Sequence, residues 1–321
     1  MKELLDHVNT LYGLEITSTT NVTKGFLTEN HFLESDTGKY FLKKYRFNNK
    51  RKIEEIHEVK KYFSDGGIPV ILPIKTIGGN TFFEFQSGFY AIFPFISGRE
   101  LGREELTETA IRSLGEMLGH IHLLGKKALI QIEDKPYARN QVKSLDRNLL
   151  IINNIKSQET LSELDRIALA DLELKTHLLE TSPVVEMDQK LPHDHLIHGD
   201  YLISNVFFSS SDTVSSVFDF EKTIYASRLF ELFRSMMLGF YDNTDKLRMY
   251  LDSYSIIYPV SKEEVWSGLI NYFRNNIHGA WPASEYYLHN NIRVAQLIIE
   301  DAKRTKYISD NFHRIEDKLL N

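Results

Sequence analysis

The sequence from 196 to 208 reads LIHGDYLISNVFF, and after a polar turn a second run at 217–221 reads VFDFE. Both runs are mainly apolar, but their polar side chains include Asp200, Asn205 and Asp219, whose oxygen atoms suit proton or metal chemistry. Two apolar runs joined by a short polar turn predict a β-hairpin. That hairpin would return Asp219 to the side of Asn205.

This pattern resembles the catalytic core of the aminoglycoside phosphotransferase and choline kinase family. The family signature is His-Gly-Asp, four residues, Asn, and a hydrophobic strand that ends in Asp, and this chain matches it from His198 onward. Phosphoryl transfer needs a carboxylate that accepts the proton of the attacking hydroxyl, and oxygen ligands that hold Mg²⁺ against the phosphates. The resemblance therefore implies Asp200 as the catalytic base and Asn205 and Asp219 as metal ligands. His198 is expected to hold the loop by hydrogen bonds.

The implied activity is that of a small-molecule kinase, with ATP or GTP as the phosphate donor. It would phosphorylate a hydroxyl of an acceptor such as an aminoglycoside, an amino alcohol or a sugar. The family also includes kinases of homoserine, methylthioribose and hexosamines, so the fold alone does not choose the acceptor. The His-Arg-Asp and Ala-Pro-Glu motifs of protein kinases are absent from the chain, which disfavours a protein substrate.

The resemblance implies an α+β, two-lobed, protein-kinase-like fold. We expect a small, β-rich N-terminal lobe with one helix at 1–96, and a larger, mainly helical, catalytic and acceptor-binding lobe at 97–321. The hinge would lie at about 93–98. The residue patterns agree with this division, because short β-rich segments precede Phe95 and long helical periods follow Gly98.

The first lobe has signals for both strands and a helix. The segments HFLE at 31–34 and YFLKKY at 40–45 lie on either side of Ser-Asp-Thr-Gly, whose Asp and Gly predict the turn of a hairpin. Apolar residues at three- and four-residue spacing from Ile53 to Phe63 predict an amphipathic helix that stops at Gly66. Further strands are predicted at 71–77, 81–86 and 89–95.

Kinases of this kind hold the nucleotide phosphates with a strand lysine, which is paired with a helix glutamate. Lys43 is the expected lysine, and its neighbour Lys44 points to the opposite face of the strand, because side chains alternate. Glu55 is the expected partner on the helix. Glu54 and Glu58 stay open as alternatives, because they occupy neighbouring faces of the same helix.

The expected hinge contributes backbone groups to nucleotide binding. In kinase hinges a carbonyl accepts a hydrogen bond from the purine and an amide two residues later donates one. Pro94 keeps its carbonyl although it lacks an N–H group, and Ile96 would be the donor. The segment 24–30 stands where a phosphate-covering loop is expected, but it contains a single glycine.

The second lobe is dominated by helical patterns. A stripe of apolar residues from Ile111 to Leu124 ends at Gly125, which we expect to cap the helix. A second helical region is expected at 142–179, and the residues at 291–320 predict a surface helix with one solvated face. The aromatic-rich block at 250–287 is also predicted to belong to this lobe.

We expect the acceptor pocket in this helical region, because aromatic and acidic side chains suit a sugar or a cationic amine. Packing between helices is an equally good explanation for most of the aromatic residues. The candidate residues are Tyr254, Tyr258, Trp266, Tyr272, His278, Trp281, Tyr286, Tyr287, Glu263, Glu264 and Glu285.

Two positions depart from the family pattern. Phe220-Glu221 follows Asp219, where kinases commonly have Phe-Gly, and the run RLFEL at 228–232 stands in place of an Asp-Leu pair. Glu231 is the residue that would serve in place of that aspartate. The resemblance runs from about residue 20 to 235 and is weakest in the first lobe.

Two other functions stay open at this point. A metal-dependent hydrolase could use the cluster of His193, His195 and His198, but that reading leaves Asn205 and Asp219 unexplained. A catalytically idle relative would bind nucleotide as a regulatory module. Every core residue of the signature is present, which favours the active enzyme over the idle module.

The composition fits an ordinary globular protein. The chain has 321 residues, 42% of them hydrophobic and 26% charged, with a formal net charge of −6 and no cysteine. The negative charge disfavours a nucleic-acid partner, and the lack of cysteine excludes disulfides and thiolate chemistry. We expect a cytoplasmic protein with no membrane partner, which binds a nucleoside triphosphate and a small acceptor. The sequence does not predict an oligomeric state.

Overall fold

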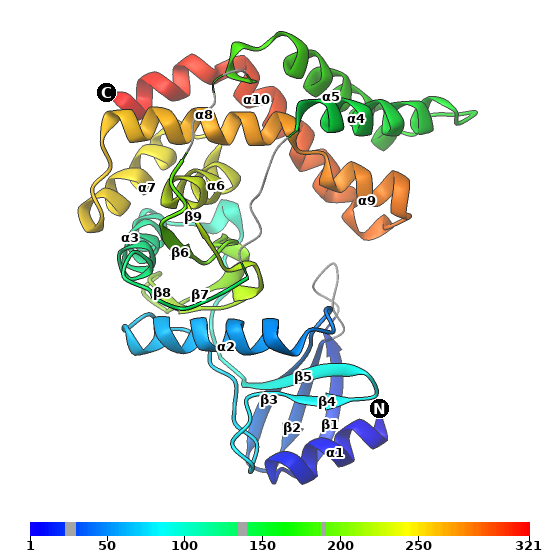
Figure 1. The fold of residues 1–321 in the computed structure, drawn as a ribbon, viewed down its shortest axis with the longest axis vertical. Coiled ribbons are helices and arrows are strands. Elements are labelled where there is room, and N and C mark those ends of the chain that lie inside the picture. Colours follow the sequence, from blue (N-terminus) through cyan, green and yellow to red (C-terminus); the bar gives the residue numbers. More distant parts are fainter. Residues whose placement is uncertain (23–29, 134–139, 186, 188–190) are drawn as a thin grey trace.

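The protein is described by a computed structural model, in which an N-terminal part built on a β-sheet is joined to a larger, mainly helical part (Figure 1). This confirms the expected α+β class. The lobe boundary at 96/97 stays a prediction. The structure describes residues 1–22, 30–133, 140–185, 187 and 191–321.

An antiparallel sheet with the strand order β1-β2-β3-β5-β4 forms the centre of the N-terminal part among the described residues. The predicted hairpin is β2–β3, with Ser35 opposite Gly38. The elements here are α1 (Lys2–Tyr12), β1 (Ile16–Val22), β2 (Asn30–Ser35), β3 (Gly38–Lys44), α2 (Lys50–Asp65), β4 (Phe83–Phe85) and β5 (Gly88–Pro94).

The two faces of this sheet pack against different helices. Leu42 of β3 is buried in a cluster with Leu4 of α1, whereas Ala91 of β5 is buried with Ile53 of α2. Lys43 is the register partner of Ala91, so the alternation of side chains places it on the α2 face. Figure 1 shows that α2 lies between the sheet and the helical part. Lys43 therefore points toward the junction of the two parts.

The prediction of a strand at 71–77 is wrong, because this segment forms no continuous series of backbone hydrogen bonds with a neighbouring strand. Its backbone amides donate to separate partners: Ile71 to Val217, Ile74 to Ile92 and Ile77 to Leu11. Pro73 lies between them and has no amide to donate. The alternating apolar residues therefore mark an extended connection that crosses several elements.

The helical part contains the predicted helices in a more divided form. The region predicted at 142–179 consists of two helices, α4 and α5, and the aromatic block contains α7, α8 and α9. Its helices are α3 (Glu108–Gly125), α4 (Gln141–Lys156), α5 (Glu163–Thr181), α6 (Arg228–Phe240), α7 (Thr244–Ile257), α8 (Lys262–His278), α9 (Trp281–His289) and α10 (Ala295–Leu320). Its strands are β6 (His195–Ile197), β7 (Val206–Phe208), β8 (Val214–Val217) and β9 (Ile224–Ala226). Short 3₁₀ turns lie at η1 (Arg103–Glu105), η2 (Pro183–Val185), η3 (Ile203–Asn205), η4 (Phe220–Lys222) and η5 (Ile292–Val294).

The predicted hairpin after the catalytic signature is β7–β8, in which Val206 pairs with Val217. It is joined to the connection between the two parts, because the backbones of Arg99 and Phe208 exchange two hydrogen bonds. Gly98 allows this approach, since a Cβ atom there would lie 2.4 Å from Cβ of Phe207. The segment that follows β5 is thus packed directly on the β7–β8 hairpin.

The last helix, α10, has the inner and outer faces that the sequence predicts. Ile298, Thr305, Ile308 and Ile315 are buried along it, while many of its charged side chains pair with each other on the outside. Across the described ranges, none of the helices combines the length and the apolar character needed to cross a membrane.

Gly125 does not cap α3 as expected, because it is the last helical residue and Lys126 follows in a right-handed conformation. A Cβ atom at Gly125 would lie 2.0 Å from the carbonyl oxygen of Leu196 in β6. The glycine is therefore needed for the close approach of α3 to β6, the strand that leads into the loop at 198–200.

We predict that Gly125→Ala lowers the free energy of unfolding by about 1–3 kcal/mol, because the new methyl group forces α3 away from β6. The better helix propensity of alanine opposes this by about 1 kcal/mol. Urea unfolding followed by circular dichroism measures the difference. Gly78→Ala is the matched control, since its Cβ would meet no atom closer than 3.8 Å. Equal midpoints for the two variants would contradict the packing argument.

Candidate active site

The loop that carries Asp200 begins at a glycine whose place no side chain fits. Gly199 has a φ of +84°, and a Cβ atom there would lie 1.8 Å from the carbonyl oxygen of Lys222. Both facts exclude a side chain at this position. The close approach brings Asp200, the next residue, beside the segment that follows Asp219.

Asp200, the expected base, is held by two cations. Its Oδ2 lies 2.8 Å from Nζ of Lys222, and its Oδ1 lies 2.7 Å from a guanidinium nitrogen of Arg234 on α6. Burial alone would raise the pKa of Asp200, but Arg234 and Lys222 outweigh it and hold that pKa below its usual value. The carboxylate is therefore ionised at neutral pH and has a fixed orientation.

Asn205 is oriented by the same loop. Its Nδ2 donates a hydrogen bond of 2.8 Å to the backbone carbonyl oxygen of Asp200, and the backbone carbonyl of Asn205 accepts one from the amide of Phe218. Because Nδ2 is hydrogen-bonded to the loop, the side-chain oxygen Oδ1 is the atom of Asn205 that could bind a metal ion. An amide oxygen here and the nearby carboxylate of Asp219 fit the oxygen ligands that Mg²⁺ prefers.

Asp219 lies two residues after β8, directly before η4, in an unusual conformation. Its φ is +64°, a left-handed value that is uncommon for residues other than glycine. Its Oδ1 lies 2.9 Å from Nζ of Lys43, which reaches across from β3. Burial would raise the pKa of Asp219, but Lys43 holds it below its usual value. The structure thus brings together Lys43 and Asp219, which lie 176 residues apart in the sequence.

The expected pair of Lys43 with Glu55 is not formed in this structure. Nζ of Lys43 lies 2.7 Å from Oε1 of Glu221 instead. Glu55 is buried, but its carboxylate contacts Arg51 and the backbone amide of Glu133. The two alternatives on α2 are exposed: Glu54, which pairs with Lys50, and Glu58.

His198 holds the loop through three hydrogen bonds, as expected. Its Nδ1 accepts from the amide of Asp200, its Nε2 donates to the carbonyl oxygen of Phe218, and its backbone amide donates to Glu231. This pattern requires a neutral ring with the proton on Nε2. Burial lowers the pKa of His198, which keeps the ring neutral.

Glu231 of α6 is the buried anchor of this network. Its carboxylate accepts from the backbone amides of His198 and Tyr201, and His122 of α3 lies 3.0 Å away. Burial would raise the pKa of Glu231, but its hydrogen bond and charge interaction with His122 help to hold it below the usual value. The sequence had indicated that Glu231 takes the place of the aspartate in the family's Asp-Leu pair. His122 lies in no recognised motif, so nothing in the sequence selects it.

The expected hinge residues lie where β5 leaves the sheet. Pro94 ends β5, and the amide of Phe95 donates to the carbonyl oxygen of Lys39. Ile96 is partly buried. Binding of a purine by Pro94 and Ile96 stays a prediction. The expected phosphate-covering loop at 24–30 lies almost entirely outside the described residues.

The histidine cluster of the hydrolase hypothesis is not assembled as a metal site. His195 contacts Asp194 and Tyr258, and both ring nitrogens of His198 are engaged in the loop. Within the described part of the chain, no group of three or more His, Cys, Asp or Glu side chains is arranged to hold a metal ion.

Most of the expected acceptor-binding aromatics belong to the packing between helices. Tyr254 hydrogen-bonds to His122, His278 to Ser144 and Tyr287 to Asp165. Trp281 differs, because 46% of its surface is exposed. The acceptor pocket therefore stays a prediction.

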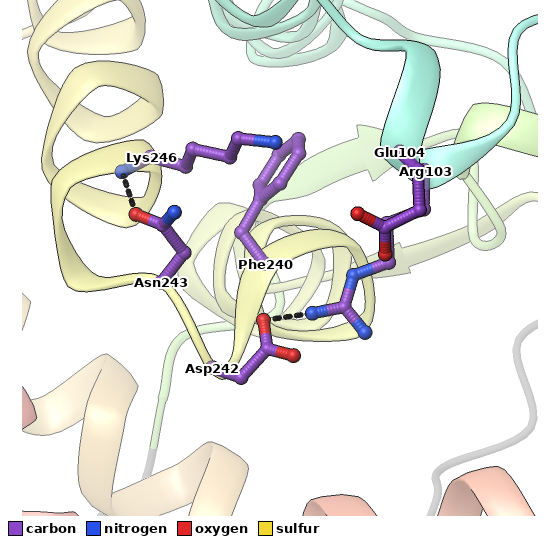
Figure 2. Close-up of a pocket in the computed structure, with 6 residues that line it drawn as sticks. All are labelled: Arg103, Glu104, Phe240, Asp242, Asn243 and Lys246. Carbon is purple, nitrogen blue, oxygen red and sulfur yellow. Dashed lines mark hydrogen bonds and ion pairs between the residues drawn. The ribbon is translucent and has the colours of Figure 1, made fainter.

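Two cavities have linings that do not include Asp200, Asn205 or Asp219. The cavity in Figure 2 has a volume of about 260 Å³ and lies where α6 meets α7. Arg103 and Asp242 form an ion pair across it, and the Asn243 side chain caps α7 at the Lys246 amide. A second cavity of about 400 Å³ is lined by residues that include Asp194, Arg228 and Glu264. Neither cavity is lined by Lys43, Asp200, Asn205 or Asp219, but the second is lined by three of the predicted acceptor residues: Tyr258, Glu263 and Glu264.

Residues 18–263 match the phosphotransferase enzyme family, and the chain belongs to this family. A homoserine kinase from Methylobacillus glycogenes is 23% identical over 267 residues, which cover 80% of this chain and 76% of the relative. The structure of spectinomycin phosphotransferase in complex with ADP and spectinomycin is similar, with a TM-score of 0.70, 18% identity, and 98% and 97% of the two chains covered.

A microcompartment-associated aminopropanol kinase has a TM-score of 0.68 and 13% identity, with 100% and 99% of the two chains covered. The family match and these structural similarities confirm the expected family, the kinase-like fold and the expectation of a small-molecule phosphotransferase. The geometry adds Lys222, Arg234 and Glu221, which the sequence had not indicated as site residues.

We predict that Glu231→Gln destabilises the protein by about 1–3 kcal/mol, because an amide NH₂ would face a backbone amide that needs an acceptor. The loop that holds Asp200 would loosen, so phosphotransfer should fall as well. Urea unfolding and a phosphotransfer assay measure the two effects. Glu180→Gln, an exposed change on α5, is the control. Wild-type stability in Glu231→Gln would contradict the anchoring role.

Proposed function

We propose that this protein transfers the γ-phosphate of ATP or GTP to a hydroxyl of a small molecule, with Mg²⁺ held by Asn205 and Asp219 and with Asp200 as the base. The observation that supports this most strongly is the convergence of Asp200, Asn205 and Asp219 in one hydrogen-bonded loop system. Lys43 from the opposite part of the molecule meets the same system at Asp219.

The nucleotide would lie between the two parts. Its phosphates would be held by Lys43, and its purine would contact the backbone of Pro94 and Ile96. Two relatives support a nucleotide co-substrate: spectinomycin phosphotransferase was solved with ADP, and an amicoumacin kinase with AMP-PNP. Glu55 is left out of this proposed phosphate clamp, since its carboxylate contacts Arg51 and the Glu133 amide.

The transfer would proceed directly from nucleotide to acceptor, without a covalent enzyme intermediate. Asp200 would accept a hydrogen bond from the acceptor hydroxyl and take its proton as the hydroxyl oxygen bonds to the γ-phosphorus. The bond from that phosphorus to the β-phosphate oxygen would break at the same time, which releases ADP or GDP. Lys222 and Arg234 keep the carboxylate ionised and limit its rotation. When bound, Mg²⁺ would neutralise charge on the phosphates. Positioning and electrostatics thus supply the rate enhancement.

The charges beside Asp200 bear on the choice of acceptor. Lys222 and Arg234 place two positive charges next to the base, which disfavours an acceptor with several amino groups around the reactive hydroxyl. An acceptor with a carboxylate, or an uncharged one, fits better. The relative named homoserine kinase agrees with a hydroxylated amino acid as a candidate.

We predict ATP-dependent phosphorylation of at least one acceptor in a panel of hydroxy amino acids, amino alcohols, sugars and aminoglycosides. Asp200→Asn should reduce turnover by about 10²–10⁴-fold, because the base is lost, while nucleotide affinity changes little. Coupled ADP release measures turnover, and calorimetry measures binding. Asp245→Asn, a change of the same kind on the surface of α7, is the control.

Near-normal turnover in Asp200→Asn would overturn the assignment of the base. Tight binding of ATP without turnover on any acceptor would favour the catalytically idle module instead. Activity on aminoglycosides alone would overturn the argument from the charges of Lys222 and Arg234 but would leave the phosphotransferase assignment intact.

A further inference from the structure

Lys43 is placed between two carboxylates of one short segment. Nζ lies 2.7 Å from Oε1 of Glu221 and 2.9 Å from Oδ1 of Asp219. The lysine side chain is 13% exposed and that of Glu221 is 7% exposed, so this contact is shielded from water. Burial alone would lower the pKa of Lys43, but the two carboxylates outweigh it and raise that pKa.

We propose that Glu221 is the positioning residue for Lys43 and replaces the α2 glutamate that kinases use for this purpose. The inference rests on the proposed function, because it concerns how the enzyme holds the nucleotide phosphates. It assigns a role to the residue at which this chain departs from the usual Phe-Gly sequence.

The α2 side chain whose charge acts on Lys43 is a cation, Lys60, and not a carboxylate. Lys60 is 4% exposed, and its Nζ lies 4.2 Å from the centre of the Phe93 ring. Burial and the repulsion of Lys43 lower the pKa of Lys60 to about 7. Glu55, on the same helix, contacts Arg51 and the Glu133 amide. The carboxylate that Lys43 needs therefore comes from the helical part, at Glu221.

Asp219 cannot serve as the lasting partner of Lys43 if it binds Mg²⁺. Its side chain is 41% exposed and can be reached by a metal ion, whereas Glu221 is enclosed. The second oxygen of Glu221 lies 3.4 Å from Nε of Arg46, so both oxygens face cations of the N-terminal part. Glu221 can thus keep Lys43 in place when Asp219 turns to the metal.

The segment that carries Glu221 is itself fixed by packing. Phe220 is fully buried, and its ring lies 4.2 Å from that of His198 and 5.6 Å from that of Phe63 on α2, between ring centres. The position of Glu221 is therefore tied to the loop that holds Asp200. Lys43 would be aligned with the catalytic loop rather than with α2.

The test is a double-mutant cycle on the dissociation constant for Mg·ATP, which requires no acceptor. Glu221→Gln should weaken binding about tenfold, the size expected for a coupled charge pair. In a Lys43→Met background the same change should have an effect of less than about twofold, because its partner is gone. If Glu221 acted only on the fold, or as a metal ligand independent of Lys43, Glu221→Gln would weaken Mg·ATP binding equally in the wild type and in Lys43→Met.

Glu55→Gln tests the rival partner on α2, and Glu84→Gln on β4 is the matched surface control. Both should change binding by less than about threefold. A loss for Glu55→Gln as large as that for Glu221→Gln, or an undiminished effect of Glu221→Gln in Lys43→Met, would overturn the proposal. Thermal unfolding verifies that each variant folds, and if Glu221→Gln does not, Glu221→Asp replaces it in the cycle.

The outcomes separate this inference from the proposed function. Wild-type phosphotransfer together with an uncoupled cycle would refute the role of Glu221 alone. A wild-type protein that binds no nucleotide would refute both.

Discussion

The ion pair of Lys43 with Asp219 and Glu221 joins the two parts of the molecule at the place where chemistry is proposed. Its geometry depends on the register of β3 with β5, which places Lys43 on the α2 face of the sheet. It depends equally on the β7–β8 hairpin, whose second strand ends at Val217, two residues before Asp219. A shift of one residue in β3 would point Lys43 to the opposite face of the sheet and break the contact.

Opposing electrostatic effects meet at each acidic residue of the site. Burial alone would raise the pKa of Asp200, Asp219 and Glu231. In each case cationic or hydrogen-bonding neighbours lower the pKa by more than burial raises it. The histidine in the loop, His198, stays neutral because burial lowers its pKa. The site therefore holds ionised carboxylates in fixed positions, which suits a reaction that relies on positioning and charge rather than on a covalent intermediate.

The sequence predicted the family, the fold class and the catalytic hairpin, because those signals are local: turn residues between apolar runs and polar residues at fixed offsets. It did not predict that Lys43 meets Glu221, since that contact depends on how two distant elements pack. The segment 71–77 has a strand-like pattern, but its amides bond to separate partners and Pro73 has none to donate. Gly125 resembles a helix cap in the sequence, whereas its role is set by the carbonyl of Leu196.

The most direct test of the central claim is calorimetric titration of ATP with and without Mg²⁺, in the wild type and in Asp219→Asn. If Asp219 is a metal ligand, Mg²⁺ should strengthen ATP binding at least about tenfold in the wild type. In the variant most of this enhancement should disappear. An Asp219→Asn protein with the full wild-type enhancement would contradict the proposed magnesium-dependent phosphotransfer site.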